Sequence, residues 1–318
     1  MQEQNTASID YFKNKERFAD LINGYVYHGQ QLISAEDILE LDSVVSRIEG
    51  EGETLYADVY IVDLLRKVRV RCHAVLVALQ NQTEIHYAMP IRVMNTDAAG
   101  YHNQWRELQK VRRREKALSG SAEFLSGMKK EDRLVPIFTM VTYFGRRPWD
   151  GPKTLKDLLN LSELDEAIRK MIADYPMNLL EVRFFENLEW FHSDIRQVFG
   201  FLKYSYDKIQ LKNFIEENRE TFQDIEGDAY DLIGVMSDKN EFRRLKSKAL
   251  KEGGKYDMCK AIEDMIQDGR DEGRKAGMTN MNVLIQKLMR DNRQEELLRS
   301  TTDPVLQKKL FKEYSLEM

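Results

Sequence analysis

Two glutamines and two acids stand close together where an apolar run of the chain ends. Gln80 and Gln82 are two positions apart after the stretch AVLVAL, Glu84 follows them, and Asp63 lies in the preceding run LYADVYIVDLL. Side chains two positions apart on a strand point to the same face of a sheet. Carboxylate oxygens are preferred ligands of Mg²⁺, and a bound metal polarises a phosphodiester and activates water. The pattern therefore suits metal-assisted hydrolysis, although an acid that faces solvent at a strand end gives the same spacing.

The elements that must position these residues are strands in the first part of the chain and helices after it. Helical spacing predicts a helix over residues 10–27 and another that follows Gln82, has Pro90 near its start and extends to Lys116. From Leu188 onward the pattern is helical almost to the end. Strands are predicted by β-branched, alternating or continuously apolar runs at LYADVYIVDLL, KVRVRCH, AVLVALQN, VPIFTMVTYFG and NLLEVRFF.

Several long segments are similar to one known family. LQNQTEIHYAMPIRVMNTDAAGY contains an Asn-Gln pair followed by Thr-Glu-Ile-His-Tyr-Ala-Met-Pro. GSAEFLSGMKKEDRLVPIFTMVTYFGRRPWDGPKTLKDLL contains Phe-Leu-Ser-Gly, Asp-Arg-Leu, Tyr-Phe-Gly and Trp-Asp-Gly-Pro. FADLINGYVYHGQQLI near the start and LLRSTTDPVLQKKLFKEY near the end fit as well. Over nearly its whole length the chain resembles the bacterial PD-(D/E)xK nuclease family transposases, which are close to the recombination-promoting nucleases.

The resemblance implies both a fold and an activity. The fold would be α/β, with a restriction-endonuclease-like core (a mixed central sheet flanked by helices) over residues 1–225. An all-helical C-terminal annex that can serve oligomerisation would follow over residues 226–318. The implied activity is that of a Mg²⁺- or Mn²⁺-dependent DNA endonuclease in the cytoplasm, linked to recombination or mobile elements.

The resemblance also implies roles for single residues. Asp63 stands where the family has its metal-binding Asp, and Gln80 where it has its metal-binding Glu. Gln82 stands where other members of the superfamily carry Lys, and a Gln there is usual in this family. Asp20 in the first helix matches an accessory acid. We therefore expect Asp63, Gln80 and Gln82 to form the catalytic group, with Asp63 and Gln80 on the metal.

Gln80 is a departure from the family pattern. An amide offers a neutral oxygen and no charge, so the exchange should weaken metal binding and the electrostatic stabilisation of the transition state. Glu84 is an accessory acid that could replace the lost carboxylate, or it is a first-turn acid that favours the dipole of the following helix. Asp58 is the alternative to Asp63, because the connection from Asp63 to Gln80 is short for the family.

Phosphate contacts would need basic side chains. Arg112, Arg113 and Arg114 lie in the densest basic run, and Arg146 and Arg147 precede an aromatic residue, Trp149, in a loop. Arg92 follows the glutamine motif within the next helix. The other interpretation of each basic group is a solvated surface.

Composition limits the possibilities further. The formal net charge is −5, so DNA binding needs a local basic patch rather than bulk attraction. Only Cys72 and Cys259 are present, which argues against a disulfide framework and a structural zinc site. No run approaches the ~18 apolar residues of a membrane span. We therefore expect a cytoplasmic protein that does not enter the membrane.

Three functions fit these observations. The first is a metal-dependent DNA endonuclease weakened or silenced by Gln80, and the second is an inactive pseudo-nuclease that binds DNA or a protein partner. The third is an oligomer, with a homodimer formed through the C-terminal helices. Gly269, Gly273 and Gly277, spaced by four, favour the third because they would let another helix approach closely. Alternatively they break the helix, at about 1 kcal/mol each.

Overall fold

A computed structural model describes the chain except for residues 1, 42–43, 50–55, 238–239 and 317–318. For residues 44–49, 56–61 and 240 it describes the backbone alone. The helices are α1 (Gln2–Phe12), α2 (Lys15–Tyr27), α3 (Met89–Arg114), α4 (Gly120–Ser126), α5 (Glu166–Met171), α6 (Ile195–Tyr204), α7 (Lys208–Glu217), α8 (Arg219–Phe222), α9 (Gly227–Met236), α10 (Asn240–Ala249), α11 (Met258–Arg290), α12 (Gln294–Ser300) and α13 (Pro304–Glu313). Short 3₁₀ turns are η1 (Ala35–Asp37), η2 (Lys156–Leu158), η3 (Val182–Phe184) and η4 (Leu188–Trp190).

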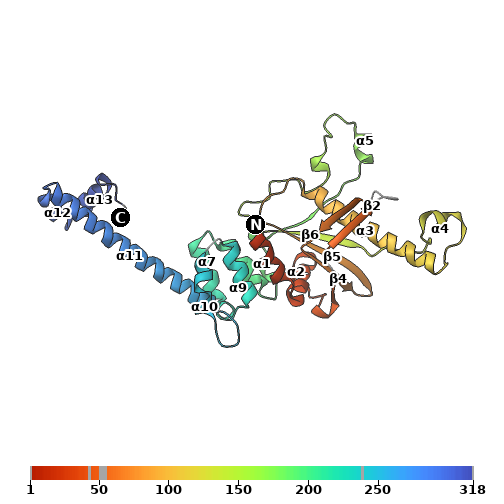
Figure 1. Cartoon of the computed structure of the whole chain (residues 1–318), viewed down its shortest axis with the longest axis horizontal. Coiled ribbons are helices and arrows are strands. Elements are labelled where there is room, and N and C mark those ends of the chain that lie inside the picture. The colour runs from red at the N-terminus through yellow and green to blue at the C-terminus, as the bar shows by residue number, and fades with distance from the viewer. Residues whose placement is uncertain (1, 42–43, 50–55, 238–239, 317–318) are drawn as a thin grey trace.

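A five-stranded mixed sheet forms the centre of the first part of the chain (Figure 1). Its order is β1 (Ile38–Leu41), β4 (Leu64–Val70), β5 (His73–Gln82), β6 (Ile137–Tyr143) and β7 (Asn178–Glu181). The pairs β1–β4 and β4–β5 are antiparallel, and β5–β6 and β6–β7 are parallel. A separate antiparallel pair, β2 (Val44–Glu49) and β3 (Tyr56–Ile61), lies against α3. The α/β class with a helical C-terminal region is confirmed, and the restriction-endonuclease-like core stays a prediction.

Helices cover both faces of the sheet, as the continuously apolar β5 predicted. On one face, Val77 and Leu79 join the main hydrophobic core with residues of α1, α2 and α6. On the other face, Val141 of β6 packs with Met89 and Val93 of α3. Successive side chains of β5 and β6 therefore alternate between α1, α2 and α6 on one side and α3 on the other.

Three sequence expectations about element boundaries are wrong. The run LYADVYIVDLL was expected to be one strand, but β3 ends at Ile61 and β4 begins at Leu64 in the other sheet. The run NLLEVRFF is a strand only as far as Glu181, where the 3₁₀ turn η3 follows. The helix expected after Gln82 begins only at Met89, so residues 83–88, with Glu84 among them, form a connecting loop. Its proline is in the first turn, as predicted.

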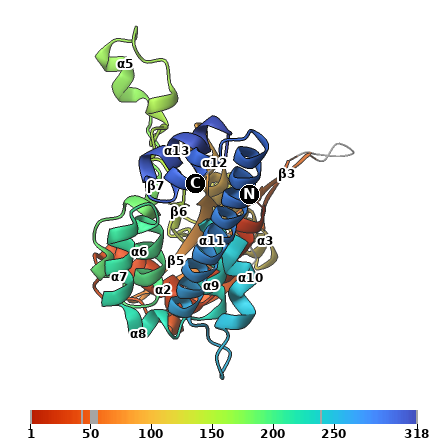
Figure 2. The same ribbon diagram turned by 90° about the vertical axis from the view of Figure 1, so that its left-hand side faces the viewer.

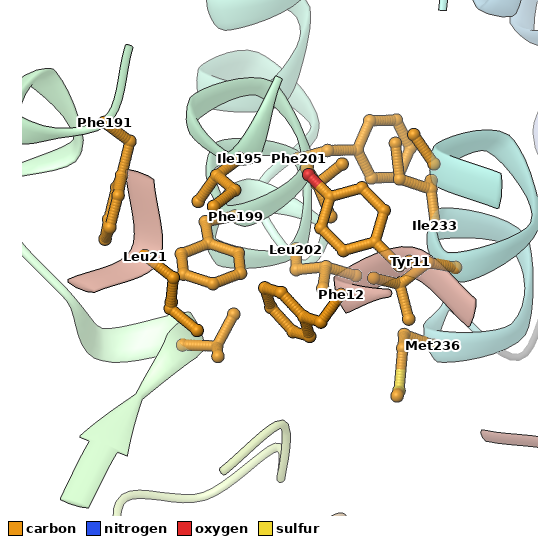
Figure 3. Packing of buried hydrophobic residues seen from close by; sticks show 14 of the residues in the cluster. Tyr11, Phe12, Leu21, Phe191, Ile195, Phe199, Phe201, Leu202, Ile233 and Met236 are labelled. Atoms are coloured by element: carbon orange, nitrogen blue, oxygen red, sulfur yellow. The ribbon is translucent and has the colours of Figure 1, made fainter. Parts of the chain in front are cut away.

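The main hydrophobic core is continuous across position 225, the end of the expected nuclease-like core. It runs from Tyr11 to Ala261 and is rich in aromatic side chains that meet edge to face (Figure 3). The buried Arg17 of α2 strengthens this continuity, because it pairs with Asp194 at 2.7 Å and with Asp228, at the start of α9, at 2.5 Å. Helix α9 therefore packs as part of the α/β unit.

Beyond that core, α11 extends away from the sheet and ends in a small helical tip (Figures 1 and 2). In the tip, Leu284 and Leu288 of α11 pack on Leu310 and Phe311 of α13 in a separate cluster. Between the two clusters, a side chain at Gly269, Gly273 or Gly277 would meet no described atom within 4 Å beyond its chain neighbours and the nearby backbone of its own helix. No helix among the described residues combines the length and apolar character that a membrane span requires.

The turn before β1 has a capping box, with Ser34 as its cap and Asp37 three residues later. The Asp37 carboxylate accepts hydrogen bonds from the Ser34 backbone N–H at 3.0 Å and the Ser34 hydroxyl at 2.8 Å. It also pairs with Arg69 of β4 at 2.7 Å. These contacts, the backbone hydrogen bond first, lower the pKa of Asp37 to about 2.

Candidate functional site

Asp63 lies where β4 diverges from β5. The last ladder pair is Leu64 with Leu79, and the Asp63 backbone N–H donates to the Leu79 carbonyl at 3.0 Å. Strand β5 continues beyond this pair, so the Asn81 N–H has no strand carbonyl to meet. The Asp63 carboxylate takes that place, because it accepts from the Asn81 N–H at 2.5 Å and from the Asn5 amide of α1 at 2.9 Å. Asp63 thus has a structural role that joins β5 to α1.

Gln80 is buried beneath α3, with 1% of its surface exposed. Its Nε2 donates to the Thr96 hydroxyl of α3 at 3.3 Å, and its Oε1 is buried without a hydrogen-bond partner among the described residues. Asn81 points to the opposite face, where its Oδ1 accepts from the Thr142 hydroxyl and no described group pairs with its buried Nδ2. The end of β5 therefore holds two incompletely satisfied amides, which are costly in a protein interior.

A pocket of about 250 Å³ opens beside Asp63 at the end of β5. Gln80 is not part of its wall, whereas Gln82 is. The lining residues are Asn5, Ser8, Asp63, Asn81, Gln82, Thr83, Glu84, Ile85, His86 and Arg92. We call it the carboxylate pocket, because it is bordered by both Asp63 and Glu84.

Glu84 reaches this pocket because it lies in a loop. The expectation that it is a first-turn acid of the following helix is wrong, since α3 begins at Met89. The sequence held a signal for this boundary: proline is favoured in the first turn of a helix, so Pro90 places the helix start close to itself. Glu84 is exposed and borders two pockets.

The second pocket, of about 320 Å³, adjoins the first through Thr83 and Glu84. It is lined by Gln4, Thr83, Glu84, Tyr143, Phe144, Gly145, Arg146, Arg147, Arg183 and Met236, and we call it the arginine pocket. Burial first, and then the charge of Glu84, raise the pKa of the Tyr143 hydroxyl. Sequence reasoning missed Arg183, because nothing local in the apolar run NLLEVRFF distinguishes it from a surface arginine.

The arginines expected to bind DNA fall into two groups. Arg92 borders the carboxylate pocket, and Arg146 and Arg147 border the arginine pocket. Arg112 pairs with Asp132, Nε to Oδ2 at 3.2 Å, and this pairing raises the pKa of Arg112. Arg113 and Arg114 are exposed at the far end of α3, about 30 Å along the helix from Arg92. Only the first group lies at the pockets.

Asp20, the expected accessory acid, is buried in α2 and lines neither pocket. Its carboxylate accepts from the His192 N–H at 2.9 Å, the Ser193 N–H at 2.7 Å and the Ser193 hydroxyl at 2.6 Å. These bonds fix the turn that precedes α6. Asp58 falls in β3, where the structure describes the backbone alone, so its side chain lies outside the described residues.

The expected metal pair does not fit Mg²⁺ in this arrangement. Asp63 borders the carboxylate pocket, whereas Gln80 does not line it and donates through its Nε2 to Thr96 of α3. Mg²⁺ sites in proteins need carboxylates in a shared cavity. Across the described part of the chain, no three His, Cys, Asp or Glu side chains are grouped so that they could hold a metal ion. The carboxylates that line the carboxylate pocket are those of Asp63 and Glu84.

Comparison of the chain with protein-family models, with curated proteins and with solved structures finds no match in any of the three. The family resemblance therefore stays a prediction. The function has to be argued from the two adjoining pockets and the residues that line them.

Proposed function

We propose that the chain is a nuclease-related DNA-binding protein of the PD-(D/E)xK transposase type that lacks the metal pair of that family. The observation that carries the proposal is Gln80, a buried neutral amide that donates to Thr96 of α3 and does not line the pocket that Asp63 borders. Around the end of the same strand, Arg92 and Arg147 border adjoining pockets. Guanidinium groups are suited to phosphate oxygens, which supply most protein contacts to DNA.

DNA binding is tested by fluorescence anisotropy of a labelled duplex over a range of salt concentrations. Because the net charge of the chain is negative, binding should depend on the arginines at the pockets. We expect Arg92→Glu to weaken binding and to lower the slope of log affinity against log salt by about 1. Arg270→Glu, an exposed site on α11, is the matched control and should leave both unchanged. Equal affinities of the parent and Arg92→Glu would contradict the proposal.

Metal-dependent DNA cleavage is the second candidate function, and it is favoured by Asp63 and Glu84 bordering one pocket. Plasmid nicking with Mg²⁺ or Mn²⁺ tests it directly. If the chain cuts, Glu84→Gln should abolish cutting, whereas Glu272→Gln on the exposed surface of α11 should not. Absence of nicking by the parent protein with either metal would reject this candidate and leave DNA binding as the proposal.

A homodimer formed through the C-terminal helices is also proposed. The tip exposes large apolar side chains, among them Met289, Leu298 and Val305, and exposed apolar groups are candidates for contact with another chain. Sedimentation analysis of the full chain should show a dimer that Leu298→Glu converts to a monomer. A parent protein that is monomeric at micromolar concentration would refute the dimer.

A further inference from the structure

A buried guanidinium lies in the wall of the arginine pocket. Arg183 has 5% of its surface exposed. Its Nε donates to the Phe144 carbonyl at 2.9 Å, and Nη1 donates to the Leu202 carbonyl at 2.7 Å and the Ser205 hydroxyl at 2.9 Å. Its Nη2 donates to the Met236 carbonyl at 2.6 Å. Leu202 lies in the last turn of α6 and Met236 ends α9, so the cation lies at two helix C-termini, where it is favourable.

These four acceptors are neutral, and they leave both the positive charge of Arg183 and one of its N–H groups available to an anion. A guanidinium has five N–H groups, and the four hydrogen bonds leave one N–H of Nη2. Among the described residues, the hydrogen-bond partners of Arg183 are three carbonyls and one hydroxyl, and no carboxylate is among them. Burial first, and the neighbouring Arg146 also, lower the pKa of Arg183. A bound anion would offset both effects, because it would supply negative charge where the acceptors of Arg183 are neutral carbonyl and hydroxyl groups.

The rest of the pocket wall is suited to phosphate. Arg147 is exposed at its rim, and Gln4 and Thr83 add neutral polar groups. The described lining side chains carry three guanidinium groups and one carboxylate, that of Glu84. A phosphate monoester carries about −1.5 to −2 charge at pH 7, more than the single charge of a diester, so it is the better match.

We propose that the arginine pocket binds a phosphate monoester, the terminal phosphate of a nucleic acid strand. The strand part of this inference rests on the proposed DNA binding. Because the two pockets adjoin at Thr83 and Glu84, a strand whose end phosphate meets Arg147 and Arg183 can extend its next nucleotides into the carboxylate pocket. The protein then recognises strand ends in preference to uninterrupted backbone.

The test compares one oligonucleotide with a 5′-phosphate, with a 3′-phosphate and without either, bound to the full chain. We expect at least one phosphorylated form to bind about tenfold more tightly than the unphosphorylated form. Arg147→Gln should remove this preference, whereas the control Arg270→Gln should retain it. Arg183→Lys should reduce the preference for phosphorylated ends as well. If that variant does not fold, the result for Arg147→Gln alone tests the proposal.

A parallel thermal-unfolding series with inorganic phosphate separates the possible outcomes. Equal affinity for the three oligonucleotides overturns the proposal. Stabilisation by free phosphate alone, removed by Arg147→Gln, would assign the pocket to free phosphate and also overturn the strand-end role. A preference for phosphorylated ends without binding to covalently closed DNA would support this inference while the general DNA-binding proposal fails. Binding to closed DNA without any end preference would support the general DNA-binding proposal and overturn the strand-end inference.

Discussion

Replacing Gln80 with Glu separates a metal site from an ordinary buried amide. From the family resemblance alone, Gln80→Glu would restore a missing metal ligand. The structure predicts a different primary effect, because the side chain is buried against α3 and no donor in the described part of the chain reaches its Oε1. The Thr96 hydroxyl already donates to the Arg92 carbonyl at 2.9 Å, so it is not free to donate to a carboxylate. A glutamate here would carry an unsatisfied charge.

The size and pH dependence of the effect follow from the pKa. Burial without donors raises the folded-state pKa of the new Glu above the ordinary value of about 4.3. Below that value the carboxyl is protonated in both states and the variant should be nearly as stable as the parent. As pH rises toward the folded pKa, stability is lost, and it stays low above it. A shift of about two units would cost about 2.7 kcal/mol at pH 7, or a melting point lower by about 5–10 °C.

Thermal unfolding followed by tryptophan fluorescence, near pH 4 and near pH 7.5, measures this effect. Gln80→Met removes the amide at similar size and should be close to neutral at both pH values. Gln82→Glu changes a residue of the pocket wall, so it should lower the melting temperature much less than Gln80→Glu does. Unchanged melting of Gln80→Glu at both pH values without metal would refute the burial argument. If Mg²⁺ raised the melting temperature of Gln80→Glu and of no other variant, the result would instead support Asp63 and residue 80 as a metal-binding pair.

Three further predictions concern single side chains. Asp63→Ala leaves the Asn81 N–H without its acceptor and should lower the free energy of unfolding by about 1–3 kcal/mol in urea titrations; an unchanged midpoint would remove its structural role. Burial raises the pKa of the Cys259 thiol to about 11, so iodoacetamide at pH 8 should label the exposed Cys72 first, and equal rates would contradict this. The lowered pKa of Asp37 contributes stability above pH 4 that is lost as pH falls toward 2, and Asp37→Asn should flatten acid unfolding in that window.

Local sequence patterns were sufficient to predict the strand and the helix whose residues line the site. The apolar run AVLVAL predicted a strand covered on both faces, and β5 has α1 and α2 on one side and α3 on the other. Pro90 predicted the first turn of α3. Both signals depend only on residues that are near one another in the sequence, which is why they could be read without the fold.

The arrangement of the site depended on contacts between distant segments. Gln80 and Gln82 share a face of β5, as predicted, but α3 covers only the first of them. The division of LYADVYIVDLL into two sheets has no proline or glycine to mark it, and it is fixed by the contact of Asp63 with Asn81. Arg183 is placed by the ends of two helices that come later in the chain. No periodicity in the sequence contains this information.

The long helix α11 makes the chain two cooperative units that share one element. Its first turns belong to the main core and its last turns to the tip, and the segment around Gly273 between them packs against neither cluster. Heat or urea should therefore melt the tip and the α/β unit in separate transitions, so that a single free energy of unfolding does not describe the whole chain. All three tryptophans, Trp105, Trp149 and Trp190, belong to the α/β unit. Tryptophan fluorescence reports on that unit alone, while far-ultraviolet circular dichroism adds the helices of the tip.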